Sequence, residues 1–455
     1  MKPLLKPRGK SAPPHSRRVW RWLCGFALAL ALLLVLVVGR LSPLPPRTLV
    51  MSTGGEDGAY HLAGMRYQQL LAAHGVHLEL QTSAGSIENH DRLRDNSVSV
   101  AFVQGGIGPQ SNGAAPEKLP LRALANVSLE PVWIFTHTID VTHGLHALAG
   151  KRIAVGMPGS GNLKLAVDLL QAYGMDVGGG GGPRAARGGT ILTPDSGMVA
   201  AEKLQRHAVD ATIIIAGPEA PAVRRLLADP AVKLASLDHV EGLSRRFGYL
   251  RPVSLKRGSV DPAHDLPPRD IALLATNTNL VVREDLHPAL AYLLLEAAQQ
   301  VHRPASLLER SGEFPNPRVT DFALSDVAER YFRNGPSFLQ SYLPFWGANY
   351  VQRLLLVLLP LAAILFPLGR LLPGLIAWRR ELRLFRHYSE LKVLEQQFTS
   401  RTLDAEDRRA AGEQLDRTES DIAKTKFPLE LSDRVYTLRQ HVDYVREQIS
   451  RDRGT

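Results

Sequence analysis

Residues 49–104, which read LVMSTGGEDGAYHLAGMRYQQLLAAHGVHLELQTSAGSIENHDRLRDNSVSVAFVQ, decide the fold. Three segments, at 49–51, 77–82 and 98–104, have the apolar or alternating pattern of strands. Small-residue loops follow the first two strands, at 52–58 and 83–86, and each loop runs into a segment with helical spacing. This order is typical of an open parallel sheet, in which ligands bind beyond the carboxyl ends of the strands.

The two loops favour an anionic ligand. Where a loop of Gly and Ser runs into a helix, unpaired backbone N–H groups lie at the positive end of the helix dipole, and carboxylates or phosphates bind there. Either loop alone is better explained as an ordinary turn between a strand and a helix. Two such loops in one unit, with a third further along the chain, favour a binding site for a small organic anion.

Three spaced motifs in this stretch resemble those of the TAXI-type solute receptors, the extracytoplasmic binding subunits of one branch of the TRAP transporters. They are TGGEDGAY at 53–60, GSIEN at 85–89 and FVQ at 102–104. The resemblance implies an α/β, two-lobed, periplasmic-binding-protein-like fold of type II, with the ligand held between the lobes. The residues that the loops and the resemblance together assign to the ligand site are Thr53, Gly54, Gly55, Gly58, Tyr60, Ser83, Gly85, Ser86, Asn89, Gln104, Ser160, Gly161 and Asn162.

The sequence departs from the family pattern in the first loop. Glu56 and Asp57 stand where small or hydroxyl residues are usual, and His61 stands where a second Tyr is common. Two acids at the cleft mouth would attract a positively charged group. They therefore predict a ligand that carries a cationic amine in addition to its carboxylate.

The second lobe is expected to begin near residue 148 and to contribute the third loop, GMPGSGN at 156–162. This loop is not a phosphate-binding P-loop, because Asn162 and Leu163 stand where Lys and Ser/Thr are required. In the family the corresponding turn closes onto the ligand from the opposite lobe. The segment EPVW at 130–133 resembles the family's crossover between lobes, and we expect Trp133 to pack in the core. Glu219, at the end of a later strand, is expected either to contact the ligand or to cap a helix.

Composition excludes several classes of protein. The net charge of +10 could indicate nucleic-acid binding, but the basic residues concentrate beside apolar segments and no nucleic-acid motif is present. A single cysteine, Cys24, excludes an intramolecular disulfide framework and a CxxC metal site. His143 and His146 lack a nearby third ligand, so no metal site is predicted. Neither a nucleophile elbow nor a cofactor motif is present, and we expect neither an enzyme nor a bound cofactor.

Two apolar segments predict membrane anchoring. Residues 19–38 approach the length of a membrane helix and follow a basic segment at 1–18; residues 351–378 are followed by Arg379, Arg380, Arg383 and Arg386. The positive-inside rule then predicts a protein of the bacterial inner membrane with both termini in the cytoplasm. The region between the two helices is expected to lie in the periplasm. The rival interpretation of residues 19–38 is a cleaved signal peptide. The segment 37–40 is a poor cleavage site, which favours an uncleaved anchor.

The tail at 379–455 is charged and has helical periodicity. Leu431, Val435, Leu438, Val442, Val445 and Ile449 follow one another in steps of four and three, as in a heptad seam. A break at 426–428 indicates either a helical hairpin or a coil that associates with a second copy of the chain.

These observations predict a solute-binding domain at 47–346, with lobe one at about 47–140 and 245–346 and lobe two at about 148–240. The expected function is capture of a small organic anion, either a carboxylate or an amino acid such as glutamate, for a TRAP-type membrane permease. The alternative is a transmembrane sensor that passes ligand binding in the periplasm to the cytoplasmic tail.

Overall fold

The computed structural model describes residues 14–41, 44–108, 120–177, 189–318, 321–335, 342–400, 405–424 and 431–451. The chain divides into two compact units, one comprising Ser42–Arg353 and the other comprising Met1–Leu41 with Leu354–Thr455. The expected basic segment before residue 14 and the expected break at 426–428 lie outside the described residues.

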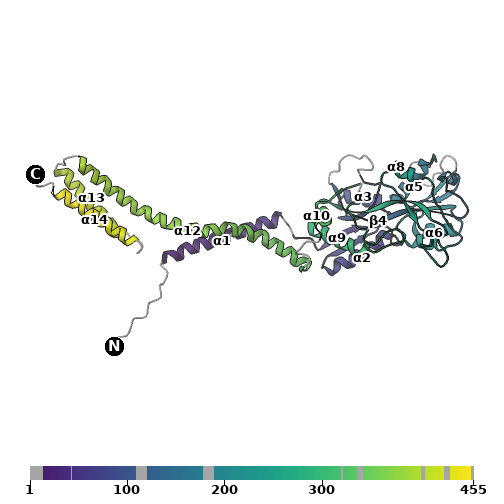
Figure 1. The fold of residues 1–455 in the computed structure, drawn as a ribbon, viewed down its shortest axis with the longest axis horizontal. Coiled ribbons are helices and arrows are strands. Elements are labelled where there is room, and N and C mark those ends of the chain that lie inside the picture. Colours follow the sequence, from purple (N-terminus) through teal and green to yellow (C-terminus); the bar gives the residue numbers. More distant parts are fainter. Residues whose placement is uncertain are drawn as a thin grey trace, which may run out of the picture. The chain divides into compact units, whose positions relative to one another are not determined.

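Two long strands organise the unit Ser42–Arg353. Strand β4 (Leu121–Thr136) and strand β10 (Ile271–Arg283) run antiparallel side by side. The first part of β4 pairs with the second part of β10, and from Val132 onward β4 pairs with β7 (Ala211–Ile215) instead. Both strands therefore pass from one lobe to the other, and Figure 1 shows β4 crossing between the two ends of this unit.

Lobe one contains the parallel strands β1 (Thr48–Ser52), β2 (His77–Gln81) and β3 (Val100–Gln104), in the sheet order β2-β1-β3-β10-β4. Helices α2 (Ala59–Ala73), α3 (Ser86–Arg94), α9 (Pro288–His302) and α10 (Asp326–Asn334) belong to this lobe. Its main core joins residues of β1, β2 and β3 to Tyr67 and Leu71 of α2 and to the apolar face of α9. The two predicted loops thus lie at the carboxyl ends of β1 and β2.

Lobe two continues the sheet in the order β4-β7-β5-β6, with β5 (Arg152–Ala154) and β6 (Ile191–Thr193) parallel to β7. Around it lie α5 (Gly161–Ala172), α6 (Gly197–Gln205), α7 (Pro221–Leu227) and α8 (Val240–Arg246). Short elements complete the unit: η1 (Leu145–Leu148), β8 (Lys233–Leu234), β9 (Arg251–Leu255) and β11 (Ala323–Leu324). The fold is thus α/β and two-lobed, of the periplasmic-binding type.

One detail of the sequence interpretation is corrected. Residues 121–125 and 131–136 each have the apolar pattern of a short strand, but in the structure they belong to the single strand β4. Pro131 lies where β4 leaves its pairing with β10 and begins to pair with β7, so the strand continues although its partner changes. The proline marks the crossover, because it has no N–H to donate to a sheet partner.

The binding unit includes the first residues of a long helix, close to the boundary expected at residue 346. Phe345, at the start of α12 (Phe345–Ser400), is 7% exposed and belongs to the core of lobe one. Trp346 donates a hydrogen bond from Nε1 to the carbonyl of His74 at 2.9 Å, and the Arg47 guanidinium lies 5.2 Å from its ring centre. The first turn of α12 is therefore part of lobe one.

The second unit is helical. Helix α1 (Pro14–Leu41) contains a shorter apolar helical stretch, Cys24–Arg40, and α12 contains Phe345–Leu371, which is long and apolar enough to cross a membrane, with a mean hydropathy of 2.3. Among the described residues this is the one helix that meets both criteria.

The tail packs within the chain as a small helical cluster. Helices α13 (Ala405–Lys424) and α14 (Ser432–Arg451) contact each other. Leu438, Val442 and Val445 of the predicted heptad seam are buried together with Leu391, Leu415 and Ile422. These contacts within the chain are those expected of a helical hairpin, and they bury part of the predicted seam.

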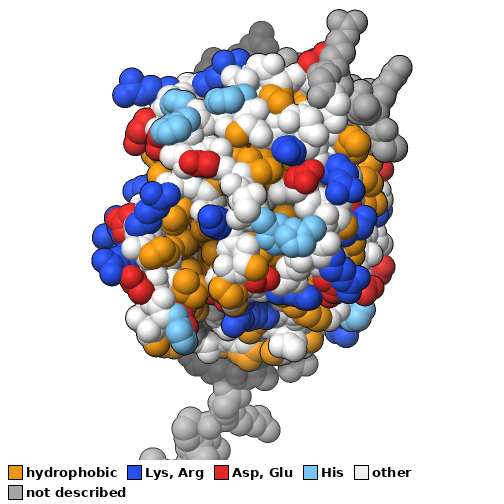
Figure 2. All heavy atoms as spheres, turned by 90° about the vertical axis from the view of Figure 1, so that its right-hand side faces the viewer, with side chains coloured by type: hydrophobic (Ala, Val, Ile, Leu, Met, Phe, Trp, Pro, Cys, Tyr) orange, Lys and Arg blue, Asp and Glu red, His pale blue; other side chains and the backbone are white. Residues whose placement is uncertain are grey.

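The face of the binding unit drawn in Figure 2 carries side chains of both charges. Figure 2 shows Lys and Arg side chains interspersed with Asp and Glu over the face drawn, without a broad patch of one sign.

Candidate functional site

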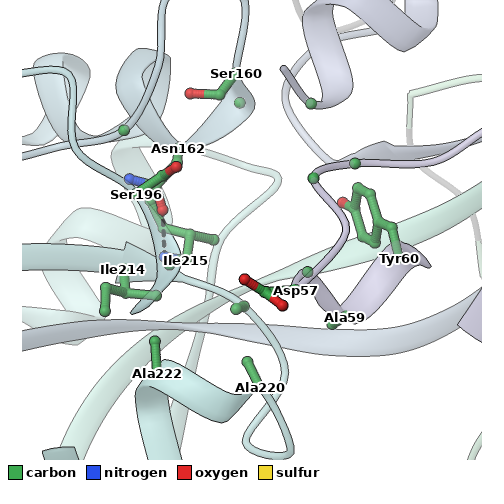
Figure 3. Close-up of a pocket in the computed structure, with 18 of the residues that line it drawn as sticks. Asp57, Ala59, Tyr60, Ser160, Asn162, Ser196, Ile214, Ile215, Ala220 and Ala222 are labelled. Carbon is green, nitrogen blue, oxygen red and sulfur yellow. Dashed lines mark hydrogen bonds between the residues drawn. The ribbon is translucent and has the colours of Figure 1, made fainter. Parts of the chain in front are cut away.

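A pocket of about 330 Å³ lies between the two lobes. Lobe one lines it with the loop 54–58, the start of α2, Gly85 and Gln104. Lobe two lines it with Gly156, the start of α5, residues 195–199 at the start of α6, and the end of β7. Glu130, on β4 at the crossover, also lines it. Figure 3 shows the two walls facing each other across this space. The volume suits a small solute such as an amino acid.

In lobe one, Asn89 ties the ends of two neighbouring strands to the second loop. Its Nδ2 donates to the carbonyls of Thr53 and Phe102, and its Oδ1 accepts from the hydroxyls of Ser52 and Ser83. Asn89 is fully buried. All of its polar atoms are engaged within the protein, so it holds the loops and does not contact a ligand.

In lobe two, Asn162 has the corresponding role. Its Nδ2 donates to the carbonyls of Val155 and Ile213, and its Oδ1 accepts from the backbone N–H of Ile215, as the dashed line in Figure 3 marks. The Ser160 hydroxyl caps α5 by accepting from the N–H of Leu163 at 3.1 Å. Thus both side chains hold the geometry of the turn that lines the pocket.

The lobes touch each other beside the pocket. Gln104 Nε2 donates to the carbonyl of Gly161 at 3.4 Å, and the backbone N–H of Glu88 donates to the carbonyl of Gly159 at 3.1 Å. A Cβ on Gly161 would lie 2.7 Å from Gln104 Oε1, which no relaxed contact allows. A Cβ on Gly85, whose φ is +135°, would lie 3.2 Å from Ser160 Cα. Glycine at both positions permits the lobes to close.

Tyr60 and Glu130 form a hydrogen-bonded pair beside the pocket. The Tyr60 hydroxyl donates to Glu130 Oε2 at 3.1 Å and lies 3.2 Å from the Ser86 hydroxyl, which in turn accepts from the N–H of Gln104. Glu130 is 4% exposed, and its burial raises its pKa to about 8 against the opposing effects of Tyr60 and Thr278. Burial and the neighbouring Glu130 also raise the pKa of Tyr60 well above its usual value.

The two walls of the pocket differ in chemistry. Lobe one and the crossover contribute Glu56, Asp57, Tyr60 and Glu130, whereas the wall of lobe two is largely apolar, with Met198, Val199, Ile213, Ile214, Ile215, Ala216, Ala220 and Ala222. Asp195 is the acid of lobe two in the lining, and Lys203 Nζ pairs with it at 2.6 Å. The described lining residues include no Lys, Arg or His.

The predicted site residues fall into two groups. Gly54, Gly55, Gly58, Tyr60, Gly85, Gln104, Ser160, Gly161 and Asn162 line the pocket, whereas Thr53, Ser83, Ser86 and Asn89 lie behind it and support the loops. Trp133 packs in the core as predicted, fully buried and bonded through Nε1 to the carbonyl of Ala216. Glu219 lies outside this lining and faces Arg224 at 3.9 Å.

Sequence reasoning missed Glu130 and the apolar wall. Glu130 stands in the quoted segment EPVW, and a lone acid inside an otherwise apolar strand was the available signal, since acids are seldom buried without a function or a partner. The apolar wall had no such signal, because Ile214 and Ile215 have the same pattern as core residues.

The sequence pattern of the NMT1-like family matches residues 51–304. No curated protein sequence matches the chain. Among solved structures, the periplasmic aliphatic sulphonate binding protein SsuA from Escherichia coli is similar at 15% identity, covering 56% of this chain and 73% of its own, with a TM-score of 0.33. The amino acid ABC transporter substrate-binding protein AbpA from Streptococcus pneumoniae, bound to L-arginine, is similar at 14% identity, covering 56% and 89%, with a TM-score of 0.34.

Proposed function

Because the chain belongs to the NMT1-like family, we propose that it is a membrane-anchored solute receptor of the TAXI type. It captures a small carboxylate or amino acid between its lobes and delivers this solute to a TRAP-type permease. The observation that carries the proposal is the 330 Å³ pocket at the ends of β1, β2 and β5, closed by direct contacts between the lobes. In open α/β sheets this is the place where ligands bind.

The ligand carboxylate is proposed to bind the backbone of the three loops. Helices α3 and α5 begin beside the pocket, at Gly85 and Gly161, and the positive end of a helix dipole favours an anion. Gln104 orients the ligand and Tyr60 covers it. The residues behind the lining, Thr53, Ser83, Ser86 and Asn89, set the loop geometry.

A thermal-shift assay on the full-length chain in detergent tests the proposal. With a panel of carboxylates and amino acids, a true ligand at a hundred times its Kd adds about 2.7 kcal/mol of stability and raises the melting temperature. Tyr60→Ala should abolish the shift, and Tyr436→Ala, on the exposed face of α14, should leave it intact. A well-folded chain that no panel member stabilises would contradict solute capture.

Anchoring is proposed through α1 and the apolar part of α12, with both termini in the cytoplasm. Reporter fusions test this topology, since alkaline phosphatase is active only outside the cytoplasm. A fusion at residue 343 should be active, and a fusion at residue 455 should be inactive. The opposite pattern would reject it.

The second candidate, a transmembrane sensor, is favoured by one observation. Helix α12 is continuous from Phe345, in the core of lobe one, to Ser400, next to the packed tail helices. Removal of residues 379–455 distinguishes the two functions. A receptor for a permease keeps solute uptake in cells without the tail, whereas a sensor loses its response while still binding the ligand.

A further inference from the structure

The charges that line the pocket restrict its ligand further than the proposed function does. Glu56 and Asp57 have no ion-pair partner among the described residues, and Figure 3 shows the Asp57 carboxylate directed into the space between Tyr60 and the Ile214–Ile215 wall. No basic side chain of the described lining compensates them. A ligand with a net negative charge, such as a dicarboxylate, would meet repulsion here that backbone N–H groups only partly offset.

Glu130 provides a second, independent observation. It is more than nine-tenths buried, it lines the pocket, and the Tyr60 hydroxyl donates to its Oε2. Beside it lies the hydroxyl of Thr278, itself 2% exposed, which like Tyr60 acts to lower the pKa of Glu130. A buried carboxyl with spare acceptor capacity beside an empty space is suited to accept N–H donors from a ligand.

We propose that the pocket selects an amino acid with an apolar side chain, an inference that rests on the proposed function. Its ammonium group binds among Asp57, Glu130 and the Tyr60 hydroxyl, and its side chain packs on Met198, Val199 and Ile215 of lobe two. Glu130 is the specificity-determining residue. A compound that lacks the amine is rejected.

Binding of the ammonium group releases a proton. Without a ligand, Glu130 is largely protonated at pH 7, because burial holds its pKa at about 8. An ammonium group at hydrogen-bond distance favours the carboxylate, so the Glu130 proton leaves to solvent as the ion pair forms. The groups that face Glu130 are Tyr60 from α2, Thr278 from β10 and, through Tyr60, Ser86 from α3. The affinity therefore rises with pH up to about 8 and then levels off.

Isothermal titration calorimetry on the full-length chain in detergent tests this inference with pairs of probes. L-leucine and L-glutamate are compared with 4-methylpentanoate and glutarate, which lack only the amine, and 3-methylbutylamine lacks only the carboxylate of leucine. We expect L-leucine to bind most tightly and 4-methylpentanoate at least about tenfold more weakly, as loss of a charged hydrogen-bonded partner implies. At pH 7, titrations in phosphate and in Tris should reveal release of nearly one proton per L-leucine bound.

Two variants test whether the released proton comes from Glu130. Glu130→Gln keeps the shape and the acceptor for Tyr60 but should remove the proton release and weaken L-leucine binding about tenfold or more. Glu219→Gln, an exposed acid outside this pocket, is the matched control and should change neither. Proton release that persists in Glu130→Gln would overturn the role of Glu130.

The remaining outcomes separate this inference from the proposed function. If 4-methylpentanoate and glutarate bind as tightly as their amino counterparts, the amine requirement is wrong and solute capture stands. If none of the probes binds to the folded chain, both the inference and the proposed function are contradicted.

Discussion

The two walls of the cleft are held by the same kind of asparagine hydrogen bonding, but they differ in the side chains that line the pocket. In each lobe one buried or half-buried asparagine near a helix start bonds the carbonyls of neighbouring strand ends, Asn89 in lobe one and Asn162 in lobe two. Lobe one then presents Glu56, Asp57 and Tyr60, whereas lobe two presents mainly aliphatic side chains. Loop geometry and ligand chemistry are thus set by different residues, and substitutions should separate them.

The largest expected effect comes from the asparagines. Asn89→Ala removes four hydrogen bonds of a buried side chain, to two carbonyls and two hydroxyls, and it should destabilise the chain by roughly 3–5 kcal/mol. Asn162→Ala removes three hydrogen bonds and should cost roughly 2–4 kcal/mol. Thermal unfolding of the full-length chain measures both, with the exposed Asn334→Ala as control. Equal melting temperatures for Asn89→Ala and the parent chain would contradict the role of Asn89 in holding the loops.

The next effect is the pH dependence of stability at Glu130. Its pKa rises from 4.5 to about 8 on folding, so the folded state binds a proton that the unfolded state has lost. Its stabilising contribution is fully present below pH 4.5 and is lost as the pH rises through 8, and a shift of this size amounts to roughly 5 kcal/mol. Compared with Glu130→Gln, the parent chain should therefore lose stability between pH 5 and pH 9. Parallel melting curves for the two proteins over this range would show that Glu130 is not held protonated.

The smallest effect concerns closure. Gly161→Ala places a Cβ 2.7 Å from Gln104 Oε1, so the lobes should close less completely and the affinity for L-leucine should fall by about tenfold, or about 1.4 kcal/mol. Gly242→Ala, which has open space around its Cβ, should leave affinity unchanged. Calorimetry measures both variants. An unaltered affinity in Gly161→Ala would mean that the contact between Gln104 and Gly161 does not contribute to binding.

Local patterns in the sequence were enough to predict lobe one and its loops. The alternation at 77–82 and 98–104, with Gly and Ser after the strands, predicts strands β2 and β3 and the position of the pocket. The roles of Asn89 and Ser86 were not predictable in this way, because a polar residue after a glycine turn can equally face a ligand or hold the backbone, and only three-dimensional contacts distinguish these. Glu130 was seen in the sequence, but its burial depends on β10 and α2, which are far from it along the chain.

The most direct test is a crystal structure of the chain with L-leucine bound. The account predicts the ammonium nitrogen within hydrogen-bond distance of Glu130 and Asp57, the carboxylate on the backbone N–H groups beside Gly85 and Gly161, and the side chain against Met198 and Ile215. A ligand in the reverse orientation, with its carboxylate beside Glu130, or one bound outside the interlobe pocket, would contradict it.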